Sequence, residues 1–305
     1  MITEPLTDLF EGGGLVITPN SNKKIIDLNY NEIVSLFEHY GVLLFRGFEL
    51  EAHEISNVTD IYTQSYANDA IRRDSRFGQK IVRDVDLGND AHSLHSEASY
   101  SLSAWPEIIW FYCNVSPQKN GATILCDGQK LWKNLSSAAK SFFLAEPLSF
   151  DLDIPFGKPR KGRGKQIWIP NTTGIRGFIN WETGSFEFTQ LIFAVHESRS
   201  GKELCFANHL LAELGKDPQI KNKFMKTMSG EKVPDQFLDE VKQKSSEITF
   251  EINWQNHDLA MIDNKRFMHG RRAFDKNITR EIVIVQTARA SFGFGSTTRN
   301  RVKES

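Results

Sequence analysis

Two side chains that can bind a metal stand close together in the segment HSEASY, residues 95–100. His95 and Glu97 are separated by one residue, and on a β-strand such residues point to the same face of the sheet. Burying an imidazole and a carboxylate side by side without partners is costly. Either water covers them or a bound ion holds them. The pair offers two metal ligands, and a third has to come from elsewhere in the chain.

The candidate for the third ligand is His269, which we expect just past a strand and beside Gly270, where chain and solvent can meet. Two imidazoles and one carboxylate on one side of a metal leave adjacent positions open. This arrangement suits Fe(II), with O2 and a chelating co-substrate in the open positions. An H-x-E pair also arises by chance, and most histidines are ordinary core or surface residues. We interpret three further histidines as structural: His196, His209 and His257.

A charged residue at the start of an apolar strand adds a second feature. Arg280 opens the segment 280–289, REIVIVQTAR, where alternating isoleucines and valines predict a central strand that is apolar on both faces. A guanidinium there is costly unless it is paired, and a bidentate carboxylate would pair it well. 2-Oxoglutarate carries such a carboxylate at one end and a metal-chelating keto acid at the other. The alternative partner is an aspartate or glutamate of the protein.

Strand-like segments dominate both ends of the chain, and helical patterns lie near the start and in the middle. Strands are predicted over 42–48, 107–115, 122–128, 247–254, 258–263 and 280–289, and helices over 31–40, 51–66 and 128–143. This order predicts a mainly β protein with helical decoration, a sandwich or barrel core, and a single domain over 1–305.

The segment 156–168, FGKPRKGRGKQIW, differs from its surroundings because it combines basic residues with three glycines and a proline. It is expected to be a solvated surface loop, since charge runs usually are. A sharper hypothesis makes it a lid over an anionic substrate. In that case Arg160 would contact the substrate, and a lid or insert would span about 146–190.

Composition excludes several classes of protein. The chain has 305 residues, is 40% hydrophobic and 25% charged, and has a formal net charge of -1, so no bulk attraction to nucleic acid or acidic membranes is expected. Its 3 cysteines show no C-x-x-C spacing, which favours reduced thiols in a cytoplasmic protein over disulfides or a cysteine zinc site. Neither a signal peptide nor a membrane-spanning apolar run is evident.

Two long blocks of sequence resemble the taurine dioxygenase/TfdA superfamily of Fe(II)- and 2-oxoglutarate-dependent oxygenases. The first is HSEASYSLSAWPEIIWFYCNVSPQKNGATILCDGQKLW, and the second is INWQNHDLAMIDNKRFMHGRRAFDKNITREIVIV. Within that superfamily the chain is similar to the H-x-E members, the clavaminate synthase-like and SyrP-like enzymes. GVLLFRGF and SGKELCFANHLL are also family-like, so the resemblance covers most of the chain and is weakest over 146–190.

The resemblance implies a double-stranded β-helix (jelly-roll) core and a role for each matching residue. His95, Glu97 and His269 would bind iron, Arg280 would clamp the distal carboxylate of 2-oxoglutarate, and the Thr123 hydroxyl would touch that co-substrate. The cofactors would be Fe(II), 2-oxoglutarate and O2. The implied reaction is hydroxylation of an unactivated C–H bond, with release of succinate and CO2.

The substrate is less determined than the cofactors. A small polar molecule is expected, either a free or carrier-tethered amino acid or a natural-product intermediate. Its contacts would include His92, Ala98, Ser99 and Tyr100, which lie next to the proposed iron ligands. Taurine dioxygenase has a second arginine four residues beyond the co-substrate arginine, and here that position is Ile284, which disfavours a sulfonate substrate.

Other reactions and other classes of protein stay open at this point. The same ligand triad supports desaturation or cyclisation. Halogenating members replace the carboxylate by a small residue, so Glu97 favours hydroxylation. A non-oxygenase, cupin-like metal enzyme would not need Arg280 and Thr123 to converge on a second ligand. A binding protein with a decayed site would not be expected to keep all three metal ligands and the arginine.

Overall fold

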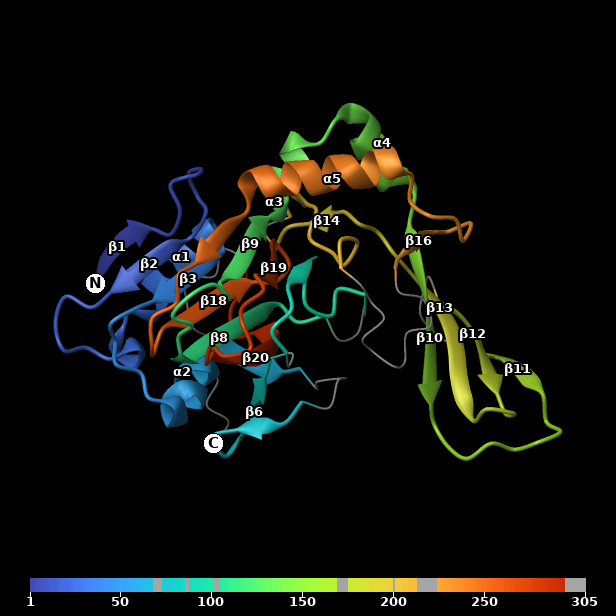
Figure 1. The fold of residues 1–305 in the computed structure, drawn as a ribbon, viewed down its shortest axis with the longest axis horizontal. Coiled ribbons are helices and arrows are strands. Elements are labelled where there is room, and N and C mark those ends of the chain that lie inside the picture. Colours follow the sequence, from blue (N-terminus) through green and yellow to red (C-terminus); the bar gives the residue numbers. More distant parts are fainter. Residues whose placement is uncertain are drawn as a thin grey trace.

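A computed structural model describes residues 1–67, 73–85, 88–100, 105–168, 175–199, 201–212 and 224–293. Within these ranges two β-sheets pack face to face and helices cover their outer faces (Figure 1). The result is the jelly-roll core with helical decoration that the sequence predicts. No helix among the described residues is long and apolar enough to cross a membrane.

The larger sheet has nine strands, and its centre is apolar on both faces. β20 pairs with β8, and β8 pairs with β18, so the predicted central strand is confirmed. The strand order is β1 (Ile2–Pro5), β2 (Leu15–Thr18), β3 (Val42–Phe45), β18 (Leu259–Asp263), β8 (Ile108–Val115), β20 (Glu281–Ala290), β6 (Gln79–Asp84) and β5 (Ser75–Arg76), with β4 (Thr63–Tyr66) also paired to β20.

The smaller sheet carries much of the candidate site. Its order is β17 (Phe250–Ile252), β9 (Thr123–Asp127), β19 (Phe267–Arg271) and β7 (His92–His95). Alternate residues of each strand face the larger sheet. On β19, Phe267 packs in the core between the sheets, whereas Met268 packs outward against the helices. His269 therefore faces inward, toward the larger sheet.

Helices cover the outer faces of both sheets. On the larger sheet lie α1 (Tyr30–Tyr40), α2 (Ile55–Tyr62) and the short 3-10 helices Ile25–Asp27 and Ala52–Glu54; against the smaller sheet lie α3 (Gly128–Asn134), α4 (Ser137–Ala145) and α5 (Asp235–Ile248). The helix ends follow local chemistry. The Asn29 side chain accepts a hydrogen bond from the Glu32 amide, and α1 stops at Gly41, whose φ of 71° suits glycine.

A third sheet forms an arm that projects away from the sandwich (Figure 1). Its order is β11 (Lys165–Trp168), β12 (Ile175–Asn180), β13 (Ser185–Ile192), β10 (Leu148–Pro155) and β16 (Lys226–Thr227), and a separate small ribbon pairs β14 (His196–Glu197) with β15 (Leu204–Cys205). Strands β10 to β13 of the arm largely coincide with the segment 146–190 that we interpret as a lid or insert, whereas β16 comes from a later part of the chain. Residues 169–174 of that segment lie outside the described ranges, and its role as a lid stays a prediction.

Several predicted boundaries are wrong in informative ways. The strand expected from 247 starts at Phe250, because Glu247 and Ile248 are the last turn of α5. The single helix expected over 128–143 is two helices, since the Ser136 hydroxyl caps a new one by accepting from the Ala139 amide. The helix expected over 51–66 ends at Tyr62 and becomes β4, and the basic segment ends in β11 rather than remaining a loop throughout.

Candidate metal centre and co-substrate site

The three predicted metal ligands meet in one place. The ligand atoms of His95, Glu97 and His269 all lie within 4.8 Å of one another. The Glu97 Oε2 atom is 3.9 Å from His95 Nε2 and 3.7 Å from His269 Nε2. β7 and β19 are antiparallel neighbours in which His95 and His269 are paired directly, and this register brings the two imidazoles together. Three donor atoms facing one small volume can hold a divalent transition metal.

The local structure differs from the sequence prediction at two of the three ligands. β7 ends at His95, so Glu97 lies in the turn that follows and not on the same strand face. His269 lies in the middle of β19, not past its end. Gly270 is buried rather than open to solvent, and a Cβ atom there would come within 2.5 Å of the His92 carbonyl oxygen. Glycine is needed because β7 and β19 approach closely at this point.

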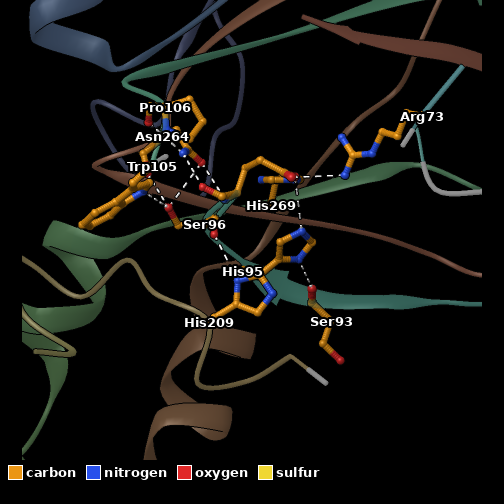
Figure 2. Close-up of polar contacts among 10 residues, drawn as sticks. Arg73, Ser93, His95, Ser96, Trp105, Pro106, His209, Asn264 and His269 are labelled. Carbon is orange, nitrogen blue, oxygen red and sulfur yellow. Dashed lines mark hydrogen bonds and ion pairs between the residues drawn. The ribbon is translucent and has the colours of Figure 1, made fainter. Parts of the chain in front are cut away.

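The turn that presents Glu97 is held by Asn264. The Asn264 side chain accepts a hydrogen bond from the Glu97 amide at 2.8 Å and donates one to the Glu97 carbonyl at 3.0 Å. Figure 2 shows Asn264 close to Ser96, Trp105 and Pro106. Asn264 is fully buried, and it also bonds the Ser96 hydroxyl group and the Pro106 carbonyl. Ala98, next in the turn, has a φ of 51°, a left-handed conformation that is unfavourable for alanine. The polar network stabilises this strained turn.

A hydrogen bond orients the His95 ring, and burial acts on His269 and Glu97. His95 Nδ1 is 2.8 Å from the Ser93 carbonyl, so it carries the proton and leaves the lone pair of Nε2 directed at Glu97 and His269. Burial, and next the nearby His95, lower the pKa of His269 well below its ordinary value. Burial opposes ionisation of Glu97, but Arg73 and the histidines outweigh burial and lower its pKa. The set therefore offers two imidazoles and one carboxylate to a metal.

Arg280 and Thr123 lie beside this cluster and contact each other. Arg280 Nη2 donates to the Thr123 hydroxyl at 3.3 Å, and Arg280 Nε donates to the Gly121 carbonyl at 2.8 Å. The Trp254 indole also donates to the Thr123 hydroxyl, at 2.9 Å. Because both lone pairs of that oxygen accept hydrogen bonds, its own proton is left to donate to another group.

The alternative partner for Arg280, an aspartate or glutamate of the protein, is not found. No carboxylate among the described residues forms an ion pair with it. Burial, together with the nearby Arg271, lowers the pKa of Arg280 to about 10. A half-buried guanidinium that no carboxylate pairs carries an energetic cost, which an anionic ligand would reduce.

These groups line one cleft between the two sheets, with about 450 Å³ of space not filled by atoms. The smaller sheet contributes the metal-ligand side, and Phe111 and Ile284 of the larger sheet form an apolar side. The described residues that line it are Arg73, Val85, His92, His95, Glu97, Phe111, Thr123, His269, Gly270, Arg271, Arg280 and Ile284.

The predicted substrate contacts are only partly gathered here. His92 lines the cleft, whereas Ala98, Ser99, Tyr100 and Arg160 are not among the described residues that line it. Tyr100 packs against Phe150 and His209, and Arg160 lies over the Trp181 ring in the arm. Their roles as substrate contacts stay predictions.

Two neighbours of the site were not expected from the sequence. Arg73 donates from Nη2 to Glu97 Oε1 at 3.1 Å, and no local motif marks it. His209, interpreted above as structural, lies beside the ligands. Its Nδ1 is 3.2 Å from the Ser96 carbonyl, and its ring centroid is 4.8 Å from that of His95. His209 belongs to the family-like segment SGKELCFANHLL, and that resemblance could have marked it as a candidate. The sequence did not show that it lies next to His95.

Comparison with known proteins agrees with this site. Residues 3–286 match the model of the family described as "Taurine catabolism dioxygenase TauD, TfdA family", so the chain belongs to that family. It is accordingly a 2-oxoglutarate-dependent dioxygenase, and its cofactors are Fe(II), 2-oxoglutarate and O2.

Individual relatives are distant but match along most of their length. Dapdiamide synthesis protein DdaC of Enterobacter agglomerans is 21% identical, covering 85% of this chain and 87% of that protein. A clavaminate synthase-like protein of Arabidopsis thaliana is 21% identical, covering 79% and 80%.

Solved structures share the fold. PvcB of Pseudomonas aeruginosa superposes with a TM-score of 0.59 at 16% identity, covering 90% of this chain and 85% of PvcB. AAD-2 in complex with Mn(II) and N-oxalylglycine gives a TM-score of 0.60 at 16% identity, covering 96% and 98%.

Proposed function

We propose that this dioxygenase hydroxylates an unactivated C–H bond of a small polar substrate, with His95, Glu97 and His269 as the iron ligands. The observation that carries the proposal is the convergence of these donors beside a half-buried arginine that has no carboxylate partner among the described residues. A triad that retains its carboxylate favours hydroxylation over halogenation, because no position is left for a halide among the protein ligands.

The donor set fits ferrous iron. Nε2 of each histidine and Oε2 of Glu97 would hold the ion, and Ser93 would fix the orientation of the His95 ring through its carbonyl. Arg280 would bind the distal carboxylate of 2-oxoglutarate, and the Thr123 hydroxyl would donate to the same co-substrate. When bound, iron and 2-oxoglutarate together activate O2 while the co-substrate is converted to succinate and CO2. The protein's share of catalysis is to orient these groups and exclude water.

The substrate is proposed to be a free or carrier-tethered amino acid or a natural-product intermediate. DdaC takes part in dapdiamide synthesis, and PvcB is described as an oxygenase from an isonitrile synthetic pathway. Arg271 also lines the cleft, and its positive charge favours a substrate with an acidic group. Ile284 also lines it, which disfavours the sulfonate of taurine. Three buried free cysteines support a cytoplasmic location.

The test has a binding step and a turnover step. Anaerobic addition of Fe(II) and 2-oxoglutarate should produce the weak visible charge-transfer band of the chelate in the wild type, but not in Arg280→Met at the same co-substrate concentration. Succinate release in air with a panel of amino acids would then identify the substrate. A product that gains one oxygen atom supports hydroxylation, and one that loses two hydrogen atoms indicates desaturation or ring closure. Absence of the band in the wild type would contradict the proposed binding of iron and 2-oxoglutarate by these residues.

A further inference from the structure

The two carboxylate oxygens of Glu97 face different partners. Oε2 lies toward the imidazoles, 3.9 Å from His95 Nε2 and 3.7 Å from His269 Nε2. Oε1 instead accepts a hydrogen bond from Arg73 Nη2 at 3.1 Å. The side chains of Arg73 and Glu97 are only 9% and 12% exposed, so water competes little with this contact.

Arg73 is itself held in position by a neighbouring strand. Its carbonyl accepts a hydrogen bond from Arg83 Nη1 of β6 at 3.2 Å. The following residue, Asp74, accepts the Asp84 amide through its carbonyl at 3.1 Å. The guanidinium therefore reaches Glu97 from the β5–β6 side, while Asn264 fixes the Glu97 backbone by separate hydrogen bonds.

We propose that Arg73 is a positioning residue that keeps Glu97 a monodentate metal ligand, an inference that rests on the metal centre of the proposed function. A carboxylate can bind a metal through one oxygen or both. With Oε1 bonded to the guanidinium, only Oε2 is left for iron. A second oxygen on the metal would occupy one of the open positions that 2-oxoglutarate and O2 need.

A direct measurement is the number of water molecules on the bound metal. Mn(II) is a suitable probe, because water bound to it raises the relaxation rate of bulk water protons. With 2-oxoglutarate chelated and Glu97 monodentate, one position is left for water. In Arg73→Met the freed Oε1 should occupy that position, so the relaxation rate of the Mn(II)–2-oxoglutarate complex should fall. The dissociation constant of 2-oxoglutarate should rise about 10-fold, as for loss of other groups that orient metal ligands.

Two further variants separate this role from charge and from fold. Arg73→Lys keeps the positive charge and a donor, and should retain most of the wild-type relaxation rate. Arg76→Met is the matched control, because Arg76 pairs with Asp84 and Glu281 and does not contact Glu97. It should leave both readouts unchanged.

Different results would contradict the role of Arg73 and the existence of the metal centre. If Arg73→Met keeps the wild-type relaxation rate with Mn(II) and 2-oxoglutarate bound, Arg73 does not control the binding mode of Glu97. The same conclusion follows if Arg76→Met loses as much as Arg73→Met. Failure of the wild type to bind Mn(II) would instead remove the metal centre on which the inference depends.

Discussion

Arg46 and Arg280 flank the ends of two inner strands of the larger sheet, and their guanidinium groups have different partners. Arg46 follows β3 and pairs with Asp258 through Nε at 3.1 Å and Nη2 at 2.7 Å. Arg280 precedes β20 and bonds a carbonyl and a hydroxyl, with no carboxylate among the described residues. Both positive charges act on the same thiol: burial raises the pKa of Cys113, and Arg280 and Arg46 each oppose that rise. A protein carboxylate thus pairs with Arg46, whereas Arg280 is the group that we propose to bind a carboxylate from outside the chain.

This contrast separates stabilisation from ligand binding. A paired buried charge contributes to the folded state, and losing one member leaves the other uncompensated. An arginine whose partner is a ligand adds to the stability of the folded state only when that ligand is bound. Substitutions on the two sides should therefore change different measured quantities.

The largest effect is expected at the metal centre. His269→Ala removes one of the three donors, so Fe(II)-dependent succinate release should fall to background while the protein stays folded. Activity and Mn(II) binding would be measured together with the circular dichroism spectrum. His39→Ala, at an exposed position of α1, is the control and should behave as wild type. Substantial turnover by His269→Ala would remove it from the ligand set.

Next in size is the response to loss of Arg280. Arg280→Met should weaken 2-oxoglutarate binding about 100-fold, roughly 3 kcal/mol for an unpaired buried carboxylate. The stability of the ligand-free protein should be unchanged or slightly higher, because the substitution removes a buried charge that lacks a carboxylate. Calorimetric titration would measure the affinity for 2-oxoglutarate, and urea unfolding would measure the stability of the ligand-free protein. A large loss of stability would mean that Arg280 is a structural residue like Arg46.

Loss of Arg46 should show the reverse pattern. Arg46→Met leaves the buried Asp258 unpaired and should destabilise the fold by about 2 kcal/mol, less than for a fully buried pair because the Arg46 side chain is 22% exposed. The affinity for 2-oxoglutarate should stay close to that of wild type. The double variant with Asp258→Asn should recover part of the stability. If it recovers none, the pair is not the source of the loss.

The smallest effect is a pH dependence. Burial raises the pKa of Asp258 despite the opposing bonds from Arg46. Because the native state then binds more protons than the unfolded state, this group's contribution to stability falls as pH rises from the unfolded pKa through the folded one. Removing Arg46 raises the pKa of Asp258 in the folded state further. The pH range over which Asp258 reduces stability therefore becomes wider. The stability gap between wild type and Arg46→Met should therefore be narrower near pH 4 than near pH 7, by about 1 kcal/mol, as measured by urea unfolding. A constant gap would contradict this account.

Much of the fold was predictable from local patterns. The apolar alternation after Arg280 predicted a central strand, and β20 is one. Boundaries were less predictable where a single polar contact decides them, as at Ser136, whose hydroxyl starts a second helix. Conversely, the turn after His95 could not be anticipated, because it depends on the buried Asn264 from a distant part of the chain.

The sequence alone determined which chemical groups are available: two histidines, an H-x-E carboxylate and an arginine at the start of an apolar strand, in an order typical of one family. Tertiary structure decided how they meet. It paired His95 with His269 across β7 and β19, and it brought Arg73 to the Oε1 atom of Glu97. It also placed Arg280 where no carboxylate of the described residues reaches it. Residue types and local periodicity can be read along the chain, whereas strand register and the partners of buried charges depend on contacts between distant segments.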